Sequence, residues 1–445
     1  MLSIKRPMVV AAIISIIISI ILLNTDSLLT IPIIAILLCL IITSIAYRQL
    51  YEYIIIFIVA LLVALSFAAK LYTKIIPAED VNELKTKITA TVTDAVFVDD
   101  YIRYTVKVTE CADDRIVGSS VYLYNYETSA AEGDKIIADV KISTLKNKGR
   151  FSHYSKDILF SGSITKIHSI GKNYSALTPI TNLRVAIKNT IFSNLPYDIA
   201  TTINGMTVGD RSYEEQYFSE IVKKCGVSHV MVVSGSHMVI VCGSVYKLTS
   251  KLKFPKNISA LLTILVTALF MALCGFSPSV LRAGFMYIFM LTGILFRKDT
   301  DPLNSLSIVT VVLLIANPFV LYDIGFILSA ASTAGIIVLN PLFLRLMKAD
   351  KWKFRPLKTI AELILLTVSA QIATLPICIY FFGFVSPYAV LANLLISFAV
   401  TLAVVSAFVG ILMYASPFTQ PYCTYVFSLC SFVTSYFNNV ILLFA

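Results

Sequence analysis

The sequence predicts a polytopic α-helical membrane protein with about eleven transmembrane helices and one small inserted β domain. Two observations lead to this fold class. Among the 445 residues, 57% are hydrophobic and only 14% are charged, which is far too apolar for a water-soluble globular protein. One stretch near the N-terminus instead alternates apolar and polar residues with the period of a β-strand.

The N-terminal segment, residues 1–75, predicts three membrane helices. Its apolar runs lie at residues 8–23, 28–46 and 53–69. Lys5 and Arg6 precede the first run as they would in a signal peptide, but no small-residue cleavage site follows it. We therefore expect this run to remain as a helix, short for a span of about 20 residues and paired with the second.

Residues 76–175 predict a small β-barrel, for which an OB-like fold is the first choice. Alternation is clearest in residues 101–108 and 136–142, and similar segments recur at intervals of roughly a dozen residues, as short strands of a barrel do. Glu132, Gly133 and Asp134 indicate a turn between strands. Positive and negative residues are nearly balanced here, so the domain as a whole is not a basic surface.

One part of this domain combines cations with aromatic rings. Its members are Lys146, Lys148, Arg150, Phe151, Tyr154 and Lys156. Such a mixture suits single-stranded nucleic acid, because bases stack on rings and phosphates meet cations. A solvated loop at one end of the barrel is the alternative, and the sequence favours it slightly.

The second half of the chain is membrane-embedded. Residues 176–225 predict an amphipathic connector, and residues 226–445 contain eight further apolar segments. If eleven helices alternate in direction, the Lys- and Arg-rich loops all fall on one side of the membrane. Because basic loops stay in the cytoplasm, we expect the β domain and the C-terminus outside it, in a multi-pass protein of the cytoplasmic membrane.

A polar stretch interrupts the first of these segments. His229 and His237, two of the four histidines, flank Ser234, Gly235 and Ser236. Polar groups at membrane depth cost several kcal/mol unless they face a partner or a cavity, so the stretch predicts a functional site. In a straight helix the two imidazoles would lie about 12 Å apart, too far to share a metal, but Ser-Gly-Ser favours an interrupted helix. The eight cysteines show no metal-site spacing either, and we expect no cofactor.

These residues carry a resemblance. The run Gly209-Asp210-Arg211-Ser212, followed by Gly226, His229, Ser234, Gly235 and His237, resembles the signature of the ComEC family, the inner-membrane channel proteins of DNA uptake in natural competence. Further blocks match in the same order, at residues 278–283, 301–304, 317–318, 325–335 and 371–393. Ser236 and Ile327 depart from the family, which usually has Leu and often has Gln at these positions.

The resemblance implies a channel for single-stranded DNA. The residues expected along the DNA path are His229, Ser234, Gly235, His237, Arg282, Gln371 and Asn393, and the motif residues are Gly209, Asp210, Arg211, Gly325 and Ser329. Each polar residue has an alternative. Arg282 can reach the membrane interface instead of a pore, and Gln371 and Asn393 more often hold helices together than contact a substrate.

Two other functions stay open. Ser234 or Ser236 with His237 suggests an intramembrane serine hydrolase, although no orienting carboxylate lies nearby in the sequence; the two histidines suggest a small-ion or metal permease. The chain has neither a P-loop nor the His-x-His-x-Asp-His motif of the nuclease domain that many ComEC proteins carry at the C-terminus. We therefore expect a non-enzymatic channel whose partners include a DNA receptor, a separate nuclease and a cytoplasmic ATPase or helicase. A homo-oligomer is left open.

Overall fold

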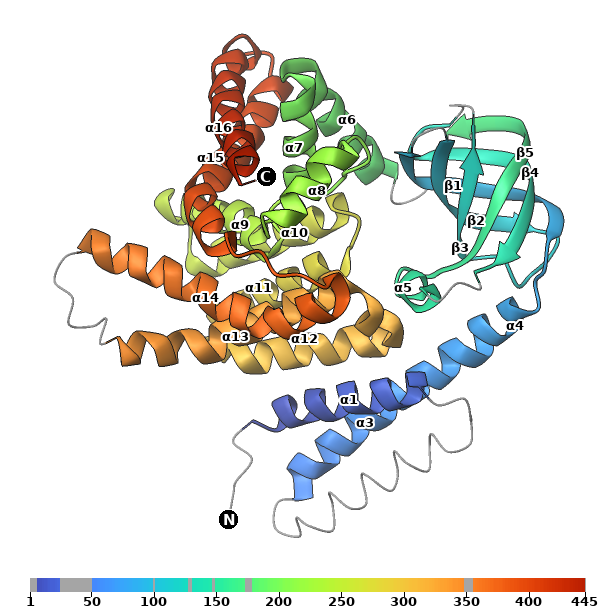
Figure 1. Ribbon diagram of the computed structural model, residues 1–445, viewed down its shortest axis with the longest axis horizontal. Helices are drawn as coiled ribbons and strands as arrows, with labels where there is room; N and C mark the ends of the chain where they lie inside the picture. The colour runs from blue at the N-terminus through green and yellow to red at the C-terminus, as the bar shows by residue number, and fades with distance from the viewer. Residues whose placement is uncertain are drawn as a thin grey trace. The chain divides into compact units, whose positions relative to one another are not determined.

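The computed structural model describes residues 6–24, 50–98, 101–126, 130–145, 149–172, 178–347 and 355–444 (Figure 1). The chain divides into two compact units, and each is described by itself. Unit 1 comprises Met1–Pro179 and Leu303–Ile327, and unit 2 comprises Ile180–Pro302 and Leu328–Ala445.

Unit 1 contains a small group of apolar helices. Helix α1 (Pro7–Asn24) packs along α3 (Leu50–Lys70), which continues through a wide turn, η1 (Leu71–Ile75), and α4 (Ile76–Glu79) into the β domain. Helix α12 (Pro302–Ala316) and the 3-10 helix η2 (Pro318–Tyr322) complete this unit. The helix expected at residues 28–46 lies outside the described residues.

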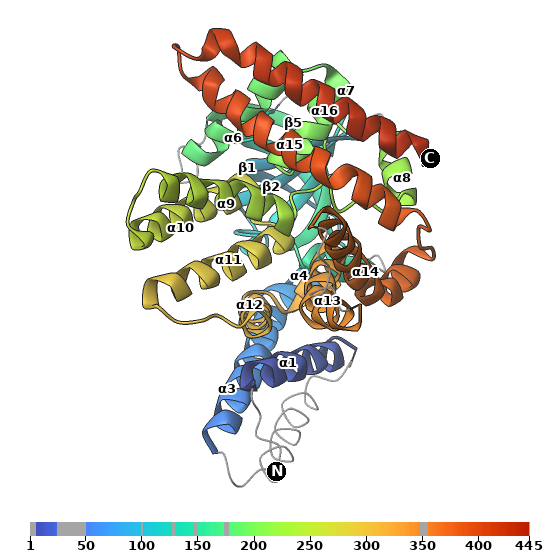
Figure 2. The same cartoon turned by 90° about the vertical axis from the view of Figure 1, so that its left-hand side faces the viewer.

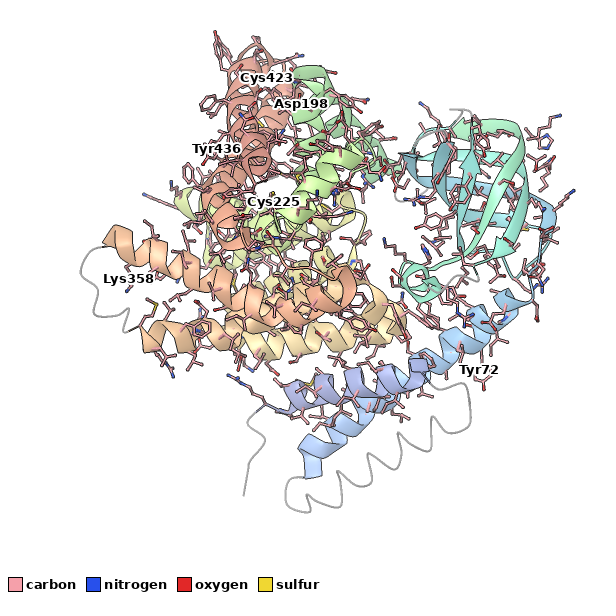
Figure 3. The ribbon with its side chains drawn as sticks, viewed as in Figure 1. Tyr72, Asp198, Cys225, Lys358, Cys423 and Tyr436 are labelled. Atoms are coloured by element: carbon pink, nitrogen blue, oxygen red, sulfur yellow. The ribbon has the colours of Figure 1, made fainter. Side chains whose placement is uncertain are left out.

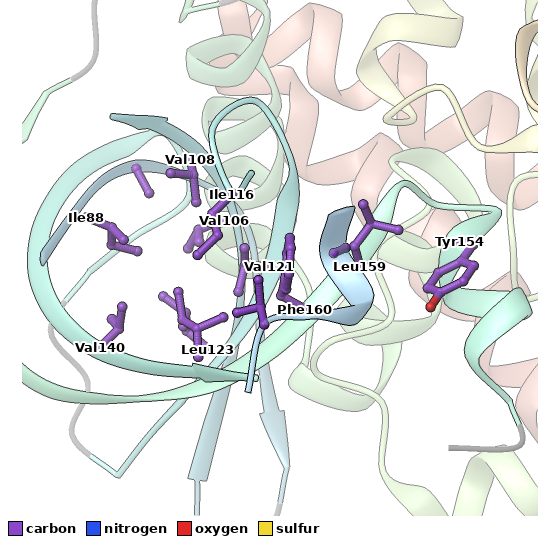
Figure 4. Close-up of a cluster of buried hydrophobic side chains, with 14 of the residues drawn as sticks. Ile88, Val106, Val108, Ile116, Val121, Leu123, Val140, Tyr154, Leu159 and Phe160 are labelled. Carbon is purple, nitrogen blue, oxygen red and sulfur yellow. The ribbon is translucent and has the colours of Figure 1, made fainter. Parts of the chain in front are cut away.

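The β domain of unit 1 is a five-stranded sheet that closes on itself. The strands are β1 (Leu84–Val98), β2 (Tyr101–Cys111), β3 (Ser120–Asn125), β4 (Asp134–Thr144) and β5 (Ile158–Lys172). Their order is β1-β2-β3-β5-β4, with β3 parallel to β5 and the other pairs antiparallel. The apolar positions of the alternating segments, such as Val106, Leu123 and Val140, fill the interior, as Figure 4 shows.

A short helix between β4 and β5, α5 (Arg150–Tyr154), joins the β domain to η2 within unit 1. The side-chain amide of Asn317 donates hydrogen bonds to the backbone oxygens of Tyr154 and Ser155, at 3.2 and 2.8 Å. The Phe319 ring packs edge-on against the ring of Tyr154 at 5.7 Å. Segments more than 150 residues apart in the sequence therefore share one core.

The described part of unit 2 consists of helices joined by loops and contains no strand (Figure 2). The connector forms α6 (Thr178–Asn194), α7 (Tyr197–Thr207) and α8 (Gln216–Lys224). The remaining helices are α9 (Gly235–Lys251), α10 (Lys256–Leu273), α11 (Pro278–Phe296), α13 (Ile324–Leu346), α14 (Arg355–Phe382), α15 (Ala389–Ala415) and α16 (Cys423–Leu443).

Seven helices of the described residues are long and apolar enough to cross a membrane, and α1 and α12 are shorter apolar helices. The protein is therefore a multi-pass helical membrane protein, while the number of eleven spans stays a prediction. The apolar segment from residue 226 is not helical until Gly235, because Ser234 is extended and caps the helix that follows.

The loop before α9 is anchored by a buried apolar core. Val227 and Met231 pack among the same buried residues as Ile396 of α15 and Phe437 of α16. Cys225, labelled in Figure 3, directs its thiol toward the backbone oxygen of Ile441, with Sγ and O 3.3 Å apart. A loop held this firmly can place its polar side chains in fixed positions.

Candidate functional site

Ser234 ends the irregular loop and begins α9. Its backbone is extended, with φ −113° and ψ 175°, and its side chain accepts a hydrogen bond from the backbone N–H of His237. In return, the backbone N–H of Ser234 donates to Nδ1 of His237 at 3.0 Å. The hydroxyl oxygens of Ser234 and Ser236 lie 2.7 Å apart. This reciprocal cap explains why Ser-Gly-Ser starts a helix instead of lying within one.

His237 is completely buried, and only one of its two ring nitrogens has a hydrogen-bond partner among the described residues. Because Nδ1 accepts the N–H of Ser234, the proton of a neutral imidazole must sit on Nε2. That Nε2 has no hydrogen-bond partner among the residues that the structure describes. His237 therefore keeps a buried donor without an acceptor, which is uncommon in folded proteins.

His229 lies in the loop before the break and is exposed. The side chain of Asn393 and the backbone of Gly226 interact with its imidazole, and His229 and His237 are near enough to interact electrostatically. Asn393 on α15 also donates to Oγ1 of Thr367 on α14 at 3.0 Å. The loop and two helices thus contribute to one polar group.

Gly226 lets this loop approach the start of α15. Its φ is +74°, which disfavours any residue with a Cβ atom. A Cβ atom here would lie 2.7 Å from Cβ of Ala389 and 2.9 Å from Cβ of Ser386. Glycine is therefore favoured at this position for two reasons, its backbone conformation and the close approach of α15.

Arg282 of α11 is buried, with 4% of its surface exposed. Its Nε donates to Oγ of Ser329 on α13 at 3.0 Å, its Nη2 donates to the same oxygen, and Nη1 lies 3.4 Å from Sδ of Met286. Nη2 is also 3.6 Å from the position that a Cβ atom would take at Gly235. The guanidinium therefore lies inside the protein, beside the first residue of α9.

The Gly-Asp-Arg motif holds the connector together. Gly209 has φ +79°, and Asp210 forms a buried ion pair with Lys188 of α6 at 2.5 Å. Burial alone would raise the pKa of Asp210, but Lys188 and two hydrogen bonds from Ser212 outweigh it, so the pKa is lowered. Arg211 pairs with Glu214 and donates to Oγ of Ser219 at 3.0 Å. The motif thus links α6, α7 and α8.

The structure brings most of the expected DNA-path residues together within unit 2. They are His229, Ser234, Gly235, His237, Arg282 and Asn393, and the motif residue Ser329 contacts Arg282. Gln371 lies on α14 one turn after Thr367, and its side-chain amide makes no hydrogen bond with a described residue. Gly325 is exposed and belongs to unit 1.

The expected nucleic-acid stretch of the β domain is placed only in part, because Lys146 and Lys148 lie outside the described residues. Arg150 pairs with Glu79 at 3.2 Å and lies over the Phe151 ring. Phe151 stacks on Tyr322, with ring centroids 4.9 Å apart, and Tyr154 is 1% exposed. These two rings pack inside unit 1, whereas Lys156 is exposed.

A second aromatic group, on the outer face of β2 and β3, was not predicted from the sequence. The guanidinium of Arg103 lies 4.9 Å from the centroid of the Tyr122 ring, which also packs edge-on against His153. Tyr101 and Tyr124 meet edge-on at 5.4 Å. Burial, Lys156 and Arg103 all lower the pKa of His153. The signal was available, because these residues occupy the outward positions of Tyr-x-Arg and Tyr-x-Tyr.

The fold and the polar group at α9 define a multi-pass helical membrane protein with a polar site among its helices. The model of the Competence protein family matches residues 206–445, more than half of the chain, and the chain belongs to this family. It is 28% identical over 242 residues to ComE operon protein 3 of Bacillus subtilis (strain 168).

That match covers 54% of this chain and 30% of the relative, so less than a third of the relative is represented. No solved structure matches the chain. The resemblance to ComEC-type competence proteins expected from the sequence is confirmed.

Proposed function

We propose that the chain forms a channel through which single-stranded DNA crosses the cytoplasmic membrane during natural competence. The observation that carries this proposal is the buried Arg282 beside the interrupted segment at α9, in a chain of the competence family. Moving phosphate charges through hydrocarbon would cost on the order of tens of kcal/mol each, so a DNA strand needs donors and cations inside the protein.

The residues near the start of α9 would bind a phosphate with different strengths. His229, Ser234 and Asn393 offer moderate hydrogen bonds, and Arg282 offers a fixed charge. Moderate contacts suit transport, because each phosphate must be bound and then released. We propose that Gln371, whose amide makes no bond with a described residue, contributes in the same way.

The proposal includes a topology. Eleven helices would place the basic loops in the cytoplasm and the β domain and C-terminus outside it. The strand order with β3 parallel to β5 supports an OB-like β domain. The proposed contacts for single-stranded DNA are the face formed by Tyr101, Arg103 and Tyr124, together with the cations Arg150 and Lys156.

Other components complete the process. The sequence contains no P-loop, so we propose that a cytoplasmic ATPase or helicase supplies the force, with a DNA receptor and a separate nuclease as further partners. Self-association into a homo-oligomer is compatible with this arrangement.

One observation favours the hydrolase alternative, since Oγ of Ser234 lies 3.0 Å from Nδ1 of His237. The reciprocal cap accounts for this contact, and the same Nδ1 already accepts a backbone N–H. A general base needs that lone pair for the nucleophile. Among the described residues, no group of three or more potential metal ligands supports a metal permease. We therefore propose transport without catalysis.

Uptake of labelled DNA into the cytoplasm tests the channel against the hydrolase. We expect His229→Ala and His237→Ala to lower import severalfold without lowering the amount of chain in the membrane or the surface binding of duplex DNA. Ser234→Ala should lower import partly, because it weakens the cap of α9. If Ser234→Ala alone abolishes function while both histidine variants import DNA normally, the channel proposal is wrong.

A further inference from the structure

Arg282 carries a buried charge whose counter-charge is not supplied by the described side chains. Its recorded partners are the hydroxyl of Ser329 and the sulfur of Met286, both uncharged. No carboxylate of the described residues lies within ion-pair distance of the guanidinium. Burying an unpaired cation is strongly unfavourable, and proteins usually neutralise such a charge.

The N-terminus of α9 adds positive potential at the same place. Helix α9 has 17 residues, so its first turn carries the positive end of a substantial helix dipole. The N–H groups of Gly235 and Ser236 have no acceptor within the helix, as at any helix N-terminus. Nη2 of Arg282 lies 3.6 Å from the position that a Cβ atom would take at Gly235, so a second positive group is adjacent to this helix end. An anion bound near both groups would relieve their repulsion.

His237 supplies a second and independent indication of a ligand. This side chain is 0% exposed, and its Nε2 lacks a hydrogen-bond partner in the described part of the chain. Its other ring nitrogen is held by Ser234, so the ring cannot turn to satisfy Nε2 without breaking the cap. His237 therefore keeps a fixed buried donor in the first turn of α9.

We infer that the first turn of α9, together with Arg282, binds an anion of the phosphate class. The guanidinium fork and adjacent N–H groups suit the paired oxygens of a phosphate, and the exposed Ser236 offers a hydroxyl donor. Ser329 positions Arg282 by accepting from two of its nitrogens. This inference rests on the proposed function only in naming the physiological source, which is one phosphodiester of a transported DNA strand.

The test compares phosphate with chloride in the purified full-length chain. The midpoint of thermal unfolding in detergent is measured in sodium phosphate and in sodium chloride at equal ionic strength. A ligand that binds only the folded state raises the midpoint. We expect phosphate to raise it by several degrees in the unmodified chain and by nothing in Arg282→Met, which keeps an apolar stem of similar length without the charge.

Two further variants serve as controls. Lys298→Met removes one exposed positive charge just beyond the C-terminal end of α11, the helix that carries Arg282, and should keep the full phosphate effect. If Arg282→Met does not fold, Ser329→Ala keeps the charge but loses its positioning contact, and should reduce the phosphate effect by half or more. An equal phosphate effect in the unmodified chain and in these Arg282 and Ser329 variants would overturn the site.

A second arm identifies the source of the phosphate. A short oligothymidylate and its abasic counterpart, which has the same backbone without bases, are titrated into the unmodified chain and Arg282→Met. If the site binds a strand, both oligonucleotides should bind, and Arg282→Met should weaken both several-fold and reduce the salt slope by about one phosphate.

The outcomes separate the two proposals. Stabilisation by inorganic phosphate without any effect of Arg282→Met on either oligonucleotide would support an anion site and overturn its assignment to DNA. Loss of the phosphate effect in Arg282→Met with normal DNA import would also overturn that assignment and leave the channel proposal standing. No stabilisation of the unmodified chain by phosphate or by either oligonucleotide would overturn the anion site itself.

Discussion

Arg103 on the β domain and Arg282 among the helices are the same residue type in opposite surroundings. Arg103 lies over the ring of Tyr122 on the outer face of a sheet and is partly exposed, whereas Arg282 is 4% exposed and bonded to a hydroxyl. Water solvates part of the guanidinium of Arg103, whereas the charge of Arg282 is stabilised by protein groups alone. Buried polar groups should therefore decide the stability and function of unit 2. The partly exposed polar groups of the β domain should contribute less to its stability.

Lys188→Met should give the largest effect, because it leaves Asp210 buried without its ion-pair partner. We expect a loss of about 3–5 kcal/mol in the free energy of unfolding at pH 7. In the unmodified chain the folded pKa of Asp210 is lowered, so its contribution is complete above the unfolded value of about 3.9 and is lost as the pH falls through the folded pKa. The difference between variant and unmodified chain should shrink below about pH 4.

Denaturant unfolding in detergent from pH 7 to pH 3 measures this difference. Lys358→Met is the matched control, because the pair of Lys358 with Glu362 is partly exposed and its atoms are 3.9 Å apart. The control should change stability by less than about 0.5 kcal/mol. A Lys188→Met variant as stable as the control at pH 7 would contradict the comparison between buried and exposed charges.

Gly226→Ala should come next, with a loss of about 2–3 kcal/mol. The added Cβ atom meets Ala389 and Ser386 and also disfavours the positive φ. Gly149→Ala in the β domain is the control, because its Cβ atom would meet nothing within 4 Å and its φ is −87°. Thermal unfolding of the two variants measures the contrast, which fails if both lose the same stability.

Arg103→Ala should have the smallest effect on stability, about 1 kcal/mol or less, from the lost contact with the Tyr122 ring. The effect of Arg103→Ala on the binding of single-stranded DNA is more informative than its effect on stability. If the outer face of β2 and β3 contacts single-stranded DNA, Arg103→Ala should weaken oligonucleotide binding by the full-length chain severalfold and lower its salt dependence. Unchanged affinity at low salt would confine DNA contacts to other surfaces.

The helices and strands could be predicted from the sequence because they depend on the periodicity of apolar residues. Long apolar runs of residues 226–445 became helices such as α10, α11 and α13 to α16, and alternation marked the strands. Ser-Gly-Ser indicated an interruption at the start of α9, but nothing in the sequence showed that His237 closes a cap on Ser234 there. The position of Arg282 near a helix end also left two alternatives, because its hydrogen-bond partner, Ser329, lies on another helix.

Long-range packing was equally out of reach for the rings of the β domain. Phe151 and Tyr154 have the composition of a nucleic-acid surface, but Phe319 and Tyr322 pack against them from a segment more than 160 residues away. Nothing local in the sequence indicates such a partner. The outward residues Tyr101 and Arg103, in contrast, follow directly from strand alternation once the inward positions are known.

The contact of Asn317 with the backbone of Tyr154 and Ser155 also limits how this protein can be recombined. Unit 1 is built from two separate pieces of chain, because residues 303–327 belong with residues 1–179. A chimera that exchanges only the N-terminal piece with a relative would pair a foreign β domain with the native Asn317 and Phe319. Exchange of this module between family members therefore requires two crossovers beyond the first, so that both pieces travel together.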